Sequence, residues 1–105
     1  MYQSTVKLTA GTGDASGVIQ RIQADLTPLI EGASGFIAYT AVKIDDQTVI
    51  TTRLFRDKAS LDAETSLTQN ETAQITNDFQ LTAEYLVESD VNIGVASELT
   101  EVYQP

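Results

Sequence analysis

The segment from Gly35 to Phe55 constrains the fold of this chain more than any other part of the sequence. It reads GFIAYTAVKIDDQTVITTRLF, which is two runs of strand-forming residues, 36–44 and 48–55, around the polar turn DDQ. Both runs carry apolar residues on both faces, and a strand with two buried faces needs cover on each side. The helices of a chain of 105 residues can cover one face. We therefore expect a second copy of the chain to cover the other.

The rest of the chain shows both strand-like and helical periodicity. Alternation of apolar and polar residues predicts a half-buried strand over 2–8 and a last strand over 91–95. Helical spacing predicts an amphipathic helix over 15–31 and a second helical region over about 58–87, with a break near 69–71. The predicted order is strand, helix, strand, strand, helix, strand.

Short polar side chains and one proline mark where the helices start and bend. Asp14 or Ser16 can cap the first helix and Asp57 or Ser60 the second, because their side-chain oxygens accept from the free N–H groups of the first turn. Pro28 lies inside the first helix without a backbone donor. We expect the helix to kink or fray there.

This element order predicts an α+β fold of the ferredoxin-like βαββαβ type, with an antiparallel sheet and both helices on one face. A chain of this length is one domain, 1–105. In the second hairpin strand, Ile50, Thr52 and Leu54 form the more aliphatic face, so we expect them under the helices. Thr51 and Arg53 then face the opposite side, toward a partner or a pocket.

Several short runs resemble the dimeric α+β barrel superfamily, which includes antibiotic-biosynthesis-type monooxygenases and many small proteins of unknown role. These runs are Leu29-Ile30, Ser34-Gly35-Phe36, Tyr39, and Leu54-Phe55 just before an acidic helix start. The resemblance implies two ferredoxin-like sheets packed face to face in a homodimer through the open sheet face. It also implies a small-molecule pocket between each sheet and its helices or inside the barrel.

The charge balance excludes some partners. The formal net charge is −9, from fifteen acidic and six basic residues. The basic residues are too few and too scattered for the basic stripe of a nucleic-acid-binding protein, and the acidity disfavours an anionic membrane surface. The first residues lack the pattern of a signal peptide or a membrane span. We therefore expect a cytoplasmic protein that binds neither nucleic acid nor membrane.

The absence of histidine and cysteine removes several chemistries. It excludes Ser-His and Cys-His nucleophile pairs and an axial histidine for haem, and it disfavours zinc, copper and non-haem iron sites. Asp45 and Asp46 lack the spacing of a calcium loop, so a solvated turn is the favoured interpretation. The glycines of 11–17 do not match a dinucleotide loop. We expect neither a metal nor another cofactor.

The candidate pocket residues are Tyr39, Thr51, Arg53 and Phe79. An arginine in an apolar cleft could hold a carboxylate or an enolate through paired charge-assisted hydrogen bonds. A tyrosine could orient or protonate a substrate oxygen. The alternative is structural: Arg53 pairs with a carboxylate across the dimer, and Phe79 belongs to the core. The acidic residues of the second helical region, Glu64 among them, are predicted to form a solvated face.

Two kinds of function remain open. One is a cofactor-free, monooxygenase-like enzyme that acts on a small apolar or enolisable substrate, with Arg53 stabilising negative charge. The other is a non-catalytic ligand-binding or structural homodimer. Fold alone does not choose between them, because the same fold carries unrelated activities.

Overall fold

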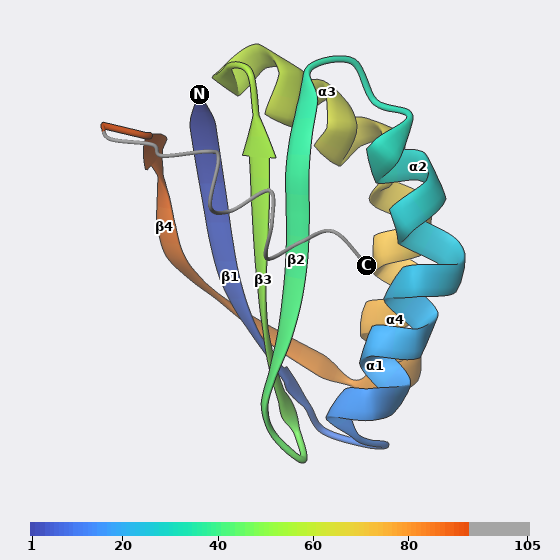
Figure 1. Ribbon diagram of the computed structural model, residues 1–105. Helices are drawn as coiled ribbons and strands as arrows, with labels where there is room; N and C mark the ends of the chain where they lie inside the picture. The colour runs from blue at the N-terminus through green and yellow to red at the C-terminus, as the bar shows by residue number, and fades with distance from the viewer. Residues whose placement is uncertain (93–105) are drawn as a thin grey trace.

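In the computed structural model, residues 1–92 are described and form one helix-backed sheet (Figure 1). The elements, in order, are β1 (Tyr2–Ala10), α1 (Ala15–Arg21), the π-helical segment η1 (Ile22–Leu26), α2 (Thr27–Glu31), β2 (Phe36–Asp45), β3 (Thr48–Phe55), α3 (Lys58–Leu67), α4 (Gln69–Phe79) and β4 (Leu81–Asp90). The four strands are antiparallel in the order β2-β3-β1-β4. The predicted ferredoxin-like α+β fold is thus confirmed. Among the described residues, no helix is both long and apolar enough to span a membrane.

The first helix is continuous but changes its winding before Pro28. α1, η1 and α2 follow one another without a loop, and η1 is a wide π turn in which Thr27 N–H donates to the carbonyl of Ile22. A proline cannot donate to the preceding turn and its ring crowds that carbonyl. The wider turn accommodates both effects, so the predicted irregularity at Pro28 takes the form of a π-helical segment. The first helix is capped by Asp14, whose Oδ1 accepts from Gly17 N–H at 2.8 Å.

The second helical region is shorter than its predicted span, and this corrects the sequence interpretation. It divides at Thr68 into α3 and α4, close to the predicted break, and it ends at Phe79 instead of near 87. Gln80 adopts the left-handed conformation with φ 50°, which ends the helix. The last strand is β4 over Leu81–Asp90, not 91–95; the residues from 93 onward lie outside the described part of the chain.

The assignment of the two faces of the β2–β3 hairpin was wrong. Thr51 and Arg53 lie on the helix side of β3, together with the fully buried Val49 and Phe55. Ile50, Thr52 and Leu54 alternate with them and so lie on the opposite side, which the helices leave open. Val49 and Phe55, near the two ends of β3, account for which face of the strand the helices cover. The large Phe55 ring gains more from burial than the Ile50 and Leu54 side chains do.

The core lies between the sheet and the helices. Its largest fully buried apolar side chains are Phe55, Ile30, Val18 and Val49. Phe55 meets Phe36 edge to face, with ring centroids 5.9 Å apart. On the other face of the sheet, residues of neighbouring strands lie side by side. Val42 of β2 pairs with Ile50 of β3. Thr52 of β3 pairs with Thr40 of β2 on one side and with Thr5 of β1 on the other. We call this surface the open face.

Candidate functional site

A cavity of about 180 Å³ lies between the sheet and the helices η1 and α4, and we call it the central cavity. Most of its wall is apolar, and a few polar side chains reach into it. The lining residues are Val6, Leu8, Ile22, Leu26, Tyr39, Thr51, Arg53, Thr72, Ile75, Thr76, Leu81, Ala83 and Tyr85. An apolar wall with a few placed polar groups is the usual character of a small-molecule site.

Arg53 and Glu64 form a buried ion pair at this cavity. Arg53 Nε lies 3.3 Å from Glu64 Oε2, and the two side chains are 17 % and 0 % exposed. Glu64 Oε1 accepts a hydrogen bond from Thr68 Oγ1 at 3.1 Å. Arg53 Nε and Glu64 Oε2 are both buried and make no well-aligned hydrogen bond with a described residue. The charges are therefore balanced, while one buried donor atom and one buried acceptor atom make no hydrogen bond with a described residue.

Tyr39 lies against the same guanidinium group. Arg53 Cζ is 5.8 Å from the centre of the Tyr39 ring, within the range of a cation–π contact. Burial raises the pKa of the Tyr39 hydroxyl, and the nearby Arg53 charge opposes that rise without reversing it. Since the usual value is already near 10, Tyr39 is a neutral phenol at neutral pH. It can donate one hydrogen bond and accept others.

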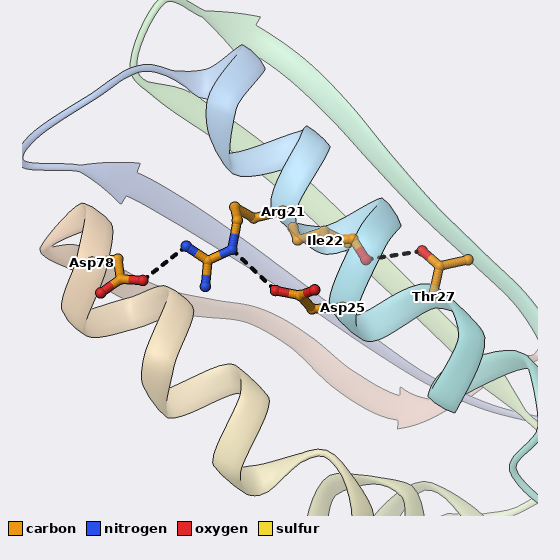
Figure 2. A network of polar contacts seen from close by, with 5 residues as sticks. All are labelled: Arg21, Ile22, Asp25, Thr27 and Asp78. Carbon is orange, nitrogen blue, oxygen red and sulfur yellow. Dashed lines mark hydrogen bonds and ion pairs between the residues drawn. The ribbon is translucent and has the colours of Figure 1, made fainter.

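A second polar network joins the first helix to α4 beside the cavity (Figure 2). Arg21 Nε lies 3.1 Å from Asp25 Oδ2 in η1, and Arg21 Nη1 lies 2.8 Å from Asp78 Oδ2 in α4. Thr27 Oγ1 donates to the Ile22 carbonyl at 3.2 Å, within the same wide turn. These ion pairs are exposed and contribute little free energy. They connect the two helical segments that carry Ile22 and Ile75.

The structure brings three of the four predicted site residues together and separates the fourth. Tyr39, Thr51 and Arg53 all line the central cavity. Phe79 is not among its lining residues; it packs where side chains on Gly13 and Gly17 would collide with its ring. It also lies 6.0 Å from the Arg21 guanidinium carbon. The glycines of the 11–17 loop are thus explained in part by close packing against Phe79.

Glu64 is the residue that sequence reasoning missed. It was grouped with the solvated acidic face of the second helical region, but it is 1 % exposed. Its position three residues after the buried Leu61 is the available signal, because residues three apart on a helix share a face. The predicted partner for Arg53 was a carboxylate across a dimer; the observed one belongs to the same chain.

Residues 1–92 contain no group of three or more acidic, histidine or cysteine side chains placed to hold a metal ion. Asp45 instead closes the β2–β3 turn: its Oδ1 accepts from Gln47 N–H at 2.9 Å, and this bond lowers the pKa of the carboxyl group. The polar part of the site thus consists of one buried ion pair, two tyrosines and three threonines.

Comparison with known proteins places the fold among small α+β proteins. No family model and no curated protein matches the sequence. A protein of unknown function from Nitrosomonas europaea is 20 % identical, covers 89 % of this chain and 95 % of its own, and has a TM-score of 0.62. A variant of SnoaB, a cofactor-independent oxygenase from Streptomyces nogalater, is 11 % identical over 90 % of this chain and 96 % of its own, with a TM-score of 0.67.

A further similar structure is a dimeric ferredoxin-like protein from an uncultured marine organism. It is 7 % identical, covers 90 % of this chain and 98 % of its own, and has a TM-score of 0.67. At these identities the similarity shows a shared fold. It agrees with the predicted ferredoxin-like fold, and the similar structures include both a cofactor-independent oxygenase and a protein of unknown function.

Proposed function

We propose that this chain binds a small apolar or enolisable molecule in the central cavity and acts on it as a cofactor-free, monooxygenase-like enzyme. The observation that carries the proposal is a guanidinium group, Arg53, set into a largely apolar cavity beside a neutral phenol, Tyr39. The shared fold with a cofactor-independent oxygenase supports it.

Each polar group has a role in this proposal. The terminal nitrogens of Arg53 stabilise the negative charge of the enolate that forms when the substrate loses a proton to water, because a charged donor in a largely apolar cavity interacts strongly. Tyr39 orients the substrate oxygen with its hydroxyl group. Glu64 is a positioning residue, whose buried carboxylate forms an ion pair with Arg53 on the Nε side of the guanidinium group. The oxidant of such a reaction is dioxygen; oxidation of a methylene to a carbonyl releases the second oxygen atom as water and needs no outside reductant.

The test compares two variants that differ only at Arg53. Glu64→Gln serves as the reference, and Arg53→Met combined with Glu64→Gln removes the guanidinium without leaving a buried carboxylate. We expect the second to bind the enolate of acetylacetone at least about tenfold more weakly, since a hydrogen bond to a charged group contributes about 1.5–3 kcal/mol. The enolate absorbance, followed in a titration at neutral pH, gives the affinities.

Equal affinities for the two variants would reject the role of Arg53. Dioxygen uptake by the wild-type protein, measured across enolisable compounds that bind, separates an enzyme from a non-catalytic ligand-binding protein. The latter is the second candidate function, and it is favoured if such compounds bind without any uptake.

We further propose that the open face pairs with a second copy of this chain. Large apolar side chains stand exposed on the sheet: Val42 is 52 % exposed on β2 and Val87 is 44 % exposed on β4. The dimeric ferredoxin-like protein of the same fold supports this arrangement. A standard interface removes about 800 Å² from each partner.

Val42→Asp is expected to convert a micromolar dimer into a monomer. Val42 is already exposed in the single chain, so the variant still folds, whereas pairing would bury an unpartnered carboxylate at a cost of several kcal/mol. Analytical ultracentrifugation measures the change. Leu67→Asp, at an equally exposed position on α3, is the control and should leave the dimer intact. A wild-type protein that sediments as a monomer would contradict the proposal.

A further inference from the structure

A second cavity, of about 230 Å³, lies between β2 and the first helix, and we call it the β2 cavity. Its inner wall is apolar, and polar side chains of η1 and α2 lie among its lining residues. The residues that line it are Ile19, Ile22, Gln23, Thr27, Ile30, Glu31, Phe36, Tyr39 and Ala41.

The two cavities share two wall residues. Ile22 and Tyr39 line both the central cavity and the β2 cavity, so these side chains form the partition between them. Ile22 comes from the start of the wide η1 turn, and Tyr39 comes from β2. Tyr39 is therefore both the neighbour of Arg53 and the boundary of the second space.

The volumes favour one divided site over two separate sites. Cavities of about 180 Å³ and 230 Å³ are each small for a ligand site. Typical small-molecule pockets hold about 300–1,000 Å³, a range that the two cavities reach only together. A molecule that extends past the Tyr39 ring would occupy both.

The charges fix the direction of such a molecule. Arg53 is the charged residue among those that line the central cavity, where Glu64 pairs with its Nε and leaves the terminal nitrogens as the charged donors, whereas the exposed Glu31 is the charged residue among those that line the β2 cavity. An anionic group is favoured beside Arg53 and disfavoured beside Glu31. The two residues at the boundary between the cavities are an aliphatic side chain, Ile22, and a phenol ring, Tyr39.

We propose that the ligand is an elongated monoanion: an acidic head group at Arg53 and an apolar body that passes Tyr39 into the β2 cavity. This inference rests on the proposed anion-binding role of Arg53 and adds the shape of the ligand. It makes Ala41, whose small side chain leaves the β2 cavity open, a residue that determines ligand length.

The test uses hexanoate and decanoate as probes, with affinities measured by calorimetric titration. Each buried methylene contributes about fourfold in affinity. Two additional buried methylenes raise the affinity more than tenfold. Decanoate is longer than hexanoate by more than this, so the wild-type protein should bind decanoate at least tenfold more tightly than hexanoate. In Ala41→Phe, whose ring fills the β2 cavity, this ratio should fall below about threefold while hexanoate affinity changes by less than twofold.

The control is Ala63→Phe, the same substitution at an exposed position of α3, which should keep the wild-type ratio. If Ala41→Phe does not fold, nuclear Overhauser contacts in the wild-type complex decide instead: the terminal methyl of decanoate should contact the methyls of Ile19 and Ile30. If hexanoate binds and decanoate binds no more tightly, the proposal of an elongated site is wrong, while the anion site stands. The same holds if the terminal methyl of decanoate does not contact Ile19 and Ile30. A protein that binds neither acid overturns the anion site as well.

Discussion

Glu64→Gln is expected to lower the free energy of unfolding by about 3 kcal/mol, because it leaves the Arg53 charge in a largely buried place without its counter-charge. The glutamine keeps the size of the side chain, and its oxygen can still accept from Thr68 Oγ1. The loss therefore reports charge balance and not packing. Urea denaturation measures it as a shift of the midpoint at constant slope.

Two further variants show whether the ion pair is the cause. Glu84→Gln neutralises an exposed carboxylate on β4 and should change stability by no more than about 0.5 kcal/mol. Replacing both partners, Arg53→Met with Glu64→Leu, should recover most of the loss, since an apolar pair fills the same space without buried charge. A double variant no more stable than Glu64→Gln would show that the pair is not the source of the effect.

Phe55→Ala is expected to cost about 3–5 kcal/mol, a large share of the stability of a domain of this size. Phe55 is 0 % exposed at the end of the interior strand β3. It pairs with Tyr2 on one side and Phe36 on the other, and its ring packs edge to face against that of Phe36. Removing the ring opens a cavity that two neighbouring strands border. The same urea titration gives the change.

Phe55→Leu should cost distinctly less than Phe55→Ala, because it keeps most of the apolar volume. Leu67→Ala is the matched control at a position that is 54 % exposed, and it should stay within about 0.5 kcal/mol of the wild type. Equal losses for alanine and leucine at position 55 would indicate that an aromatic contact, and not the filled volume, is what matters there.

The limits of sequence reasoning are visible at the boundary between α4 and β4. The residues from Phe79 to Val87 show both a helical spacing, which links Phe79, Thr82 and Leu86, and an alternation of apolar and polar residues. The helical spacing predicts a helix to about residue 87, whereas the chain forms a strand from Leu81 onward. The strand forms because its pairing with β1 satisfies backbone groups along the whole edge, and the left-handed Gln80 turns the chain toward it.

The residue types predicted which side chains line the site, but the sequence did not predict how these side chains are arranged. Tyr39, Thr51 and Arg53 were identified because they are polar side chains among apolar strand residues, and they do meet at one cavity. Phe79 is predicted only because helix residues of this kind often line the pocket in the folds that the chain resembles, and it lies elsewhere. Glu64 could not be linked to Arg53 because nothing local joins them: the contact exists only once α3 packs on the sheet.

The sequence by itself determined the order of strands and helices, the two-faced hairpin and the irregular first helix, because each follows from a local periodicity or from the backbone of one residue, such as Pro28. Only the tertiary structure decided which face of the hairpin the helices cover. Alternation along the strand places Arg53 and Ile50 on opposite faces, but it does not determine which of the two faces the helices cover. Phe55 and Val49 are buried beneath the helices, and this burial sets which face of β3 the helices cover. Arg53 lies on the same face, where it forms an ion pair with Glu64 of the same chain.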